Sequence, residues 1–370
     1  MKQLVWQHRK PLERTKRKLQ EGRLTVGFIG GSITDGRPRH NWPEPVIAWL
    51  ADKYPKVKIV VENAAIGGTG SDLAVFRVQR DLIDRGCDLV FVDYAVNDNE
   101  VPSERRLRTR EGLLRKLLMK GEAACDLVLV HTFCQDMYSS MMEGEVPNSV
   151  AQLEKLAEHY SIGSVWMGLY ALQQIKRGLI RWDEWLPDGL HPTQRGSLVY
   201  AESVIQFLQK ELSGASEEAA GTAGLGIKPL IEPLDPANWG SAYHFPLDEL
   251  KTEGPWTLRR WLYYEWIDQV LETSAVGARL SFSFEGRGIA LGFDFGSSSA
   301  EFRYRIDSGE WVTESRERPS WVGKDGWFRI SPLTDSLEPG THAFELEVIH
   351  GDRADCAGTD FRLAFAGIIQ

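Results

Sequence analysis

The feature that most constrains this fold is a regular alternation, over residues 1–212, of short apolar segments and longer helix-like segments. The apolar segments are rich in valine and isoleucine and are apolar on both faces, which is typical of parallel strands that helices cover on both sides. A last helix is predicted to end near Leu212. The alternation predicts an α/β domain, residues 1–212, in which a parallel sheet lies between two layers of helices. Its five strands are predicted at residues 24–30, 57–63, 88–94, 126–132 and 162–167.

The pattern changes after residue 212. Residues 213–226 are small, polar and rich in glycine, so residues 213–235 are interpreted as a linker. Beyond residue 236, apolar and polar residues alternate with a period of two, and turn sequences such as DSGE and EPGT separate the alternating segments. This pattern predicts a second domain over residues 236–370, an all-β sandwich or jelly roll.

Composition and charge limit the partners that the chain is expected to have. The 370 residues carry a formal net charge of −9, which argues against a nucleic-acid partner, because phosphate binding requires a basic surface. No apolar segment reaches the roughly 18 residues that a membrane-spanning helix needs. The basic N-terminal segment lacks the apolar core of a signal peptide, so a cytoplasmic location is expected. The four cysteines form no C-x-x-C pair, and reduced thiols are expected.

Ser32 lies in the stretch FIGGSITDG (residues 28–36), directly after the first predicted strand. A phosphate-binding loop does not fit, because the patterns G-x-x-x-x-G-K-[ST] and G-x-G-x-x-G are both missing. An ordinary tight turn and a nucleophilic serine both fit this stretch taken by itself. A nucleophilic serine requires a histidine base, a carboxylate that orients the histidine, and hydrogen-bond donors for an oxyanion.

The best candidate for the base is His191, in the stretch PDGLHPTQRG, because Asp188 precedes it by three residues in a short glycine-containing turn. Such a turn can bring the carboxylate back to the near ring nitrogen and leave the far nitrogen free for a serine. Glu347 and His350 have the same spacing, but they lie in a strand-like segment, where residues three apart point to opposite faces. That pair is therefore discounted.

Two further stretches offer oxyanion donors. The glycine-rich NAAIGGTGSD (63–72) follows the second predicted strand and exposes backbone N–H groups just before a helix. YAVNDNE (94–100) follows the third strand and contains Asn97, whose side chain is an amide donor. If the first three strands lie in the order 2-1-3, both stretches meet Ser32 at one edge of the sheet, where open α/β proteins bind ligands.

Together these four stretches resemble the sequence blocks of the SGNH (GDSL-type) hydrolases, and the resemblance covers about residues 22–212. It implies a flavodoxin-like sheet of five parallel strands, with no metal and no organic cofactor. It implies Ser32 as the nucleophile and Asp188 and His191 as the rest of the catalytic triad. It further implies an oxyanion hole made of the N–H groups of Ser32 and Gly68 and the side chain of Asn97.

The sequence departs from the family pattern at two positions. Gly31 stands where the family often has aspartate, and Ala95 stands in place of a glycine. Neither change is expected to touch a catalytic group.

The chemistry that the resemblance implies is ester hydrolysis through an acyl-enzyme, on a small-molecule or glycan ester. No long apolar lid follows the catalytic stretches, which disfavours a lipase for long acyl chains. The β-rich half resembles jelly-roll modules joined to SGNH domains in carbohydrate esterases, which favours the removal of acetyl groups from a glycan. Three tryptophans lie near the catalytic stretches in sequence, namely Trp42, Trp182 and Trp185. They have two open interpretations: a stacking platform for sugar rings, or ordinary packing in the core.

Two alternatives to a short-acyl carbohydrate esterase stay open. One is a general arylesterase, thioesterase or lysophospholipase of the same fold. The other is a carbohydrate-binding scaffold without activity, against which the complete set of serine, glycine, asparagine, aspartate and histidine argues. A homo-oligomer is compatible with the sequence.

Overall fold

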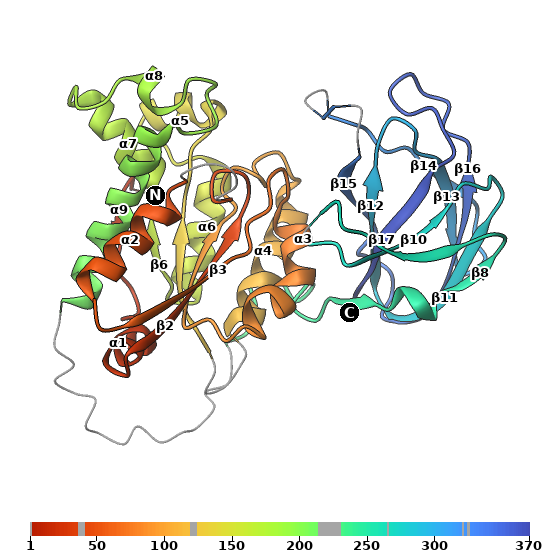
Figure 1. The fold of residues 1–370 in the computed structure, drawn as a ribbon, viewed down its shortest axis with the longest axis horizontal. Coiled ribbons are helices and arrows are strands. Elements are labelled where there is room, and N and C mark those ends of the chain that lie inside the picture. Colours follow the sequence, from red (N-terminus) through yellow and green to blue (C-terminus); the bar gives the residue numbers. More distant parts are fainter. Residues whose placement is uncertain are drawn as a thin grey trace. The chain divides into compact units, whose positions relative to one another are not determined.

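The computed structural model describes residues 2–35, 41–118, 124–213, 231–264, 266–319, 322–323 and 326–370. The chain divides into two compact units, Met1–Gly240 and Ser241–Gln370. Figure 1 shows the first unit, coloured red to green, as an α/β unit, and the second, coloured teal to blue, as a unit built of strands. The predicted combination of an α/β domain and an all-β domain is therefore confirmed.

The first unit contains a six-stranded sheet in the order β1-β6-β5-β4-β2-β3. The strands β2 to β6 are parallel, whereas the short β1, which the sequence did not indicate, pairs antiparallel with β6. Because β2 lies between β3 and β4, the predicted order of the first three strands is confirmed. The strands are β1 (Trp6–Gln7), β2 (Arg23–Gly30), β3 (Lys58–Asn63), β4 (Leu89–Asp93), β5 (Asp126–Val130) and β6 (Gly163–Val165).

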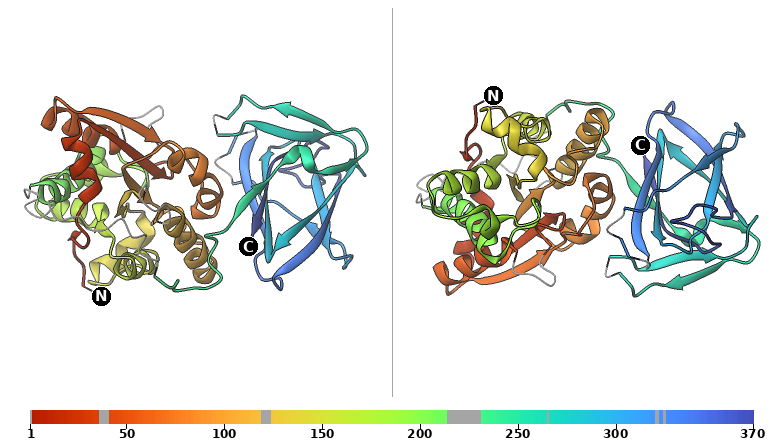
Figure 2. Two further views of the ribbon diagram at one scale, coloured as in Figure 1. Left: turned by 90° about the horizontal axis from the view of Figure 1, so that it is seen from below. Right: turned by 90° about the horizontal axis from the view of Figure 1, so that it is seen from above.

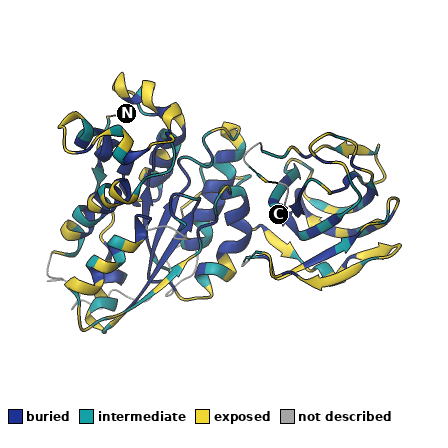
Figure 3. Ribbon diagram, turned by 45° about the horizontal axis from the view of Figure 1, so that its top comes forward, coloured by how far each residue is buried: buried dark blue, intermediate teal, exposed yellow. Residues whose placement is uncertain are grey.

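Helices cover both faces of this sheet, as Figure 2 shows from two sides. In one layer the helices α2, α7 and α8 each contact α9, and in the other α3 and α6 each contact α4. In Figure 3 the strands between them are mostly buried, while the outer faces of the helices are exposed. The helices are α1 (Glu13–Gln20), α2 (Pro43–Lys53), α3 (Ser71–Val78), the π-helix η1 (Gln79–Ile83), α4 (Ser103–Leu118), the 3-10 helix η3 (Gln135–Met137), α5 (Tyr138–Met142), α6 (Asn148–His159), α7 (Met167–Lys176), α8 (Trp182–Trp185) and α9 (Gln194–Leu212).

Strand β3 differs from the expectation that helices cover both faces of every strand. It forms the edge of the sheet, and none of its residues is fully buried. Val61, on this strand, remains 39% exposed. An apolar run therefore predicted the strand but not its place at the edge.

The first unit extends beyond the predicted boundary at residue 212. The side chain of Trp239 is fully buried, and its ring centroid lies 5.8 Å from that of Phe76. The backbone N–H of Trp239 donates to the carbonyl of Arg108. A methyl group on Gly112 would lie 2.5 Å from the backbone of Trp239, so only glycine fits there. Residues 231–240 thus complete the surface of α4. The rest of the predicted linker, residues 214–230, lies outside the described residues.

The second unit packs two antiparallel sheets against each other. One has the order β15-β12-β17-β10-β9, with β7 also paired to β17, and the other has the order β14-β13-β16-β11-β8. Their facing side chains form a core rich in phenylalanine and leucine. The elements are β7 (Tyr243–Phe245), the 3-10 helix η4 (Leu247–Glu249), β8 (Lys251–Glu253), β9 (Thr257–Arg260), β10 (Gln269–Thr273), β11 (Arg279–Gly286), β12 (Gly288–Phe295), β13 (Glu301–Ile306), β14 (Val312–Glu314), β15 (Trp327–Thr334), β16 (Gly340–Ile349) and β17 (Phe361–Ile369).

The predicted period of two is visible in the burial of β11 but not in that of β12, which is buried along its whole length. The ring of Phe365, on β17, lies across the outward face of β12 and would be 2.2 Å from a methyl group on Gly292. Among the described residues, no helix combines the length and the apolar character that crossing a membrane requires.

Candidate active site

Ser32 lies in a tight turn at the end of β2, at the edge of the sheet where the parallel strands terminate. The N–H groups of Thr34 and Asp35 both donate to the carbonyl of Gly31, at 3.0 and 2.9 Å. The side-chain amide of Asn41 donates to the carbonyl of Ser32 at 2.9 Å. These bonds fix the backbone on both sides of the serine, so its hydroxyl has a defined position.

The base of the turn contains a buried carboxyl group. Asp93, the last residue of β4, accepts hydrogen bonds from the hydroxyls of Thr34 and Thr132, both at 2.8 Å. Burial raises the pKa of Asp93 to about 6, although the two threonine hydroxyls act in the opposite direction. This carboxyl connects the serine turn to the ends of β4 and β5.

The structure brings the three residues of the predicted triad together. The Oγ of Ser32 lies 2.9 Å from Nε2 of His191, and Nδ1 of His191 lies 2.9 Å from Oδ2 of Asp188. The other oxygen of Asp188 accepts the N–H groups of Leu190 and His191, at 2.9 and 2.7 Å. Partial burial favours the protonated acid, but the bonds from His191 and Leu190 outweigh it and lower the pKa of Asp188.

A glycine shapes the loop that carries Asp188 and His191. Gly189 has φ +78°, a backbone conformation that glycine adopts without strain. A side chain there would also meet the Gln135 side chain at 2.5 Å, and the N–H of Gln135 donates to the Gly189 carbonyl at 3.0 Å. The hydroxyl of Thr193 then accepts the N–H of Gly196 and caps α9. The loop is therefore held between η3 and α9.

Asn97 lies directly over Gly31. A methyl group on Gly31 would be 2.0 Å from Oδ1 and 2.5 Å from Nδ2 of Asn97. The expectation that the glycine at position 31 touches no catalytic candidate is therefore wrong, because the missing side chain is what leaves room for the asparagine amide. Ala95, the other departure, is fully buried, and its carbonyl accepts the hydroxyl of Ser149.

The glycine-rich loop after β3 lies beside the serine. The N–H of Ile66 donates to the carbonyl of Gly30 at 3.0 Å, which keeps this loop against the end of β2. A methyl group on Gly67 would lie 3.4 Å from Cβ of Ser32. The next residue, Gly68, has φ +71° and is exposed. The structure thus gathers the serine, the glycine loop and Asn97 at one point, as the sequence predicted.

A buried ion pair, which sequence reasoning missed, ties the two loops of donor groups together. Asp98 accepts the N–H of Ser71 at 2.9 Å and pairs with Nε of Arg110 at 2.8 Å. Arg110 also donates to the carbonyl of Tyr94 at 2.7 Å. Burial lowers the pKa of Arg110 to about 10, although the Asp98 carboxylate acts in the opposite direction. Asp98 directly follows Asn97 in the chain, so its carboxylate connects the loop of Asn97 to the start of α3.

The three candidate tryptophans have different positions. Trp42 and Trp185 are both fully buried and cannot contact a substrate, so the substrate-platform interpretation is wrong for these two and packing in the core is correct. Trp42 packs edge-on against Phe28 and donates to the Thr34 hydroxyl at 3.0 Å, so it supports the serine turn from below. Trp182 alone is partly exposed, and its ring lies edge-on to Tyr138, with centroids 5.6 Å apart.

Residues 28–198 match the family model of the GDSL-like lipases and acylhydrolases. The first unit is a GDSL-like acylhydrolase. The resemblance seen in the sequence is therefore confirmed, and the chain is a carboxylic ester hydrolase. No curated protein matches the sequence.

Solved structures with the same architecture include two of a two-domain esterase. A structure of this esterase (CEX), active on acetylated mannans and co-crystallised with mannopentaose, has a TM-score of 0.81 and 21% identity and covers 99% of this chain and 97% of that chain. A second structure of this esterase has a TM-score of 0.80 and 20% identity, and the match covers 97% of this chain and 95% of that chain. For a structure of the acetylxylan esterase Axe2 from Geobacillus stearothermophilus, the match covers 53% of this chain and 97% of that chain, with a TM-score of 0.39 and 20% identity.

Proposed function

We propose that this chain removes acetyl groups from a neutral carbohydrate by attack of Ser32 on the ester carbonyl. The observation that carries the proposal is the unbroken hydrogen-bonded series from Ser32 through His191 to Asp188, at 2.9 Å for each step. A serine hydroxyl is a weak nucleophile unless a base takes its proton, and a base of this kind needs a fixed orientation.

The reaction that these groups support has two halves. As Ser32 Oγ bonds to the carbonyl carbon, Nε2 of His191 takes the hydroxyl proton and then returns it to the sugar oxygen, whose bond to that carbon breaks. A water molecule next gives a proton to the same nitrogen and attacks the acetyl carbon; the bond from that carbon to Ser32 Oγ then breaks, His191 returns the proton to Oγ, and acetate leaves. The Asp188 carboxylate holds Nδ1–H of His191 and stabilises the imidazolium that forms in each half.

Three donors are proposed for the oxyanion of both tetrahedral intermediates. They are the N–H groups of Ser32 and Gly68 and the side-chain amide of Asn97. The close approach of Asn97 to Gly31, and of Gly67 to Ser32, supports this assignment. A donor of this kind contributes about 3–4 kcal/mol to the transition state.

Two observations support a carbohydrate acetyl ester over other esters. The two-domain esterase that shares this fold over both units is active on acetylated mannans. Trp182 is partly exposed, lies on α8 shortly before His191 in the chain, and has the rings of Tyr138 and Phe133 edge-on to its own, as a platform for a sugar ring would.

Acetate release from acetylated manno- and xylo-oligosaccharides, followed by NMR, tests this function. We expect turnover of at least one of these substrates, and a higher kcat/KM for p-nitrophenyl acetate than for the octanoate. A preference for octanoate without activity on any acetylated sugar would instead favour a lipase-like enzyme.

A further inference from the structure

The second unit carries a row of polar side chains across three neighbouring strands. Glu272 of β10 lies directly opposite Thr257 of β9 and Arg362 of β17. Their neighbours in sequence, Leu271 and Leu363, are buried in the core between the sheets. Because side chains alternate along a strand, the polar row lies on the outward face of its sheet and ends at the edge strand β9.

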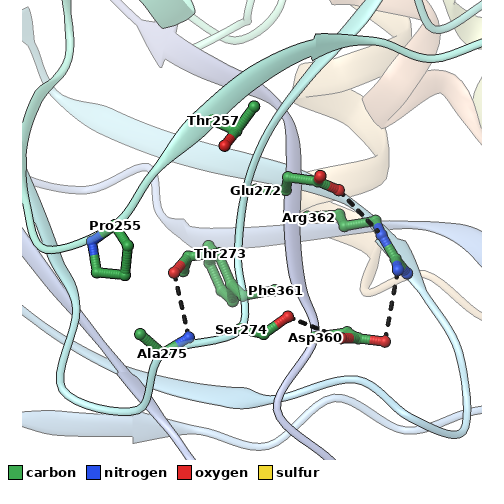
Figure 4. Close-up of a pocket in the computed structure, with 9 residues that line it drawn as sticks. All are labelled: Pro255, Thr257, Glu272, Thr273, Ser274, Ala275, Asp360, Phe361 and Arg362. Atoms are coloured by element: carbon green, nitrogen blue, oxygen red, sulfur yellow. Dashed lines mark hydrogen bonds and ion pairs between the residues drawn. The ribbon is translucent and has the colours of Figure 1, made fainter.

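This row borders a cavity of about 430 Å³. Figure 4 shows Glu272, Arg362, Asp360 and Ser274 following one another around one side of the cavity, with Pro255 on the opposite side. The Arg362 guanidinium lies 3.5 Å from Glu272 and 3.4 Å from Asp360, and the Ser274 hydroxyl donates to Asp360 at 3.0 Å. Mutual pairing therefore fixes the directions of these planar groups before any ligand arrives.

A second hollow, of about 540 Å³, shares Arg362 with the first. The Arg362 guanidinium lies over the ring of Trp261, 5.1 Å from its centroid. The ring of Tyr263 lies 4.8 Å from that of Trp261 and its residue is 80% exposed. We call the two hollows and the arginine between them the Arg362 groove. It combines an exposed aromatic ring with prearranged hydrogen-bonding groups.

We propose that the Arg362 groove binds a neutral oligosaccharide and does so independently of the ester-hydrolysing site. Every residue that lines it belongs to the second unit. The proposal goes beyond the proposed esterase activity, since the groove holds the chain of a glycan and not its ester group.

The chemistry of the groove selects this ligand class. Paired carboxylate and guanidinium groups offer acceptors and donors side by side, which suits the neighbouring hydroxyls of a sugar. An exposed tyrosine that is backed by a second ring offers an apolar face with a polar rim, which suits the C–H face of a sugar ring. Hollows of a few hundred Å³ have the usual size of small-ligand sites. Acidic ligands are disfavoured, because Glu272, Asp360 and Asp294 line the groove.

Binding to full-length protein carrying Ser32→Ala tests the proposal, because this variant cannot consume an ester. The probes are unacetylated pentasaccharides of mannose, xylose and glucose, and an oligogalacturonate as the charged comparison, each measured by calorimetry. We expect at least one neutral probe to bind and the charged probe not to bind. The variants Tyr263→Ala and Glu272→Gln should each weaken binding by about tenfold, as the loss of one central contact does.

Tyr243→Ala, at another exposed tyrosine of the second unit, is the matched control and should leave binding unchanged. The absence of binding by every neutral probe would overturn the proposal, as would binding that both groove variants leave intact. A change of molecular mass in solution on Tyr263→Ala, without any sugar binding, would assign the patch to self-association instead. Turnover of p-nitrophenyl acetate by Tyr263→Ala in the active background should equal that of the parent. The loss of sugar binding is thereby distinguished from the loss of esterase activity.

Discussion

Replacing Asp98 with asparagine tests whether the buried ion pair positions the oxyanion donors. Asparagine has the same shape, but its amide can accept only one of the two bonds that the carboxylate accepts, from Ser71 and from Arg110. The NH₂ group of the asparagine then faces whichever donor, Ser71 N–H or Arg110 Nε, is left without an acceptor. The buried guanidinium of Arg110 also loses its counter-charge. Both side chains are almost fully buried, at 2% and 1% exposure, so water cannot compensate for the loss.

The size of the effect follows from these contacts. Removing one partner of a buried ion pair costs about 3–5 kcal/mol. For a unit of this size the loss lowers the melting temperature by about 6–20 °C. If the two donor loops also shift relative to Ser32 by a fraction of an ångström to 1 Å, kcat should fall by about tenfold to hundredfold, with a smaller effect on KM.

The assay is the hydrolysis of p-nitrophenyl acetate well below the melting temperature of each variant, as a double-mutant cycle with Asn97→Ala. Because Asp98 is argued to act through the oxyanion donors, Asp98→Asn should lower kcat by a smaller factor in the Asn97→Ala background than in the parent. The matched control is Glu301→Gln in the second unit, which breaks a pair with Arg316 that is similarly buried, at 6% and 2% exposure. It should lower stability without changing kcat. Equal losses of kcat in both Asn97 backgrounds would refute the positioning role.

Three further outcomes are expected. Asn97→Ala should lower kcat and kcat/KM together by about 100- to 1000-fold, whereas a change in KM alone would leave the residue with a role in binding only. A protein ending at Gly240 should melt at a higher temperature than one ending at Ser213, because only the longer one retains the buried Trp239 ring; equal melting curves would contradict this. Burial raises the pKa of Asp93 to about 6, so the folded state binds this proton more tightly than the unfolded chain does. The contribution of Asp93 to stability should therefore fall as pH rises from about 4 to 6, and Asp93→Asn should remove this falling contribution in pH-dependent urea titrations; an unchanged pH dependence in the variant would contradict this.

The sequence predicted those parts of the site that depend on local order. Ser32 directly follows a strand, and Asp188 and His191 share one short loop, so their types and spacing are visible in the chain itself. The order of the strands then brought the glycine loop and Asn97 to the same edge. Their catalytic roles stay predictions, which the measurements above test.

What the sequence did not predict depends on contacts between distant segments. Trp42 and Trp185 lie next to the catalytic stretches in sequence, yet both rings point into the core, and nothing in the local pattern separates that position from a substrate platform. The pairing of Asp98 with Arg110 joins a loop to the middle of a helix. The docking of Trp239 on α4 likewise places in the first unit a residue that the pattern assigned to the second domain.

The central claim is that Ser32 is the nucleophile of an ester hydrolase, and labelling with a fluorophosphonate probe tests it most directly. The parent protein should lose its activity on p-nitrophenyl acetate as one probe molecule attaches, and peptide mapping should place the adduct on Ser32. Ser32→Ala should remain unlabelled and inactive while its melting temperature stays close to that of the parent. An adduct on another residue, or undiminished labelling and turnover in Ser32→Ala, would contradict the account.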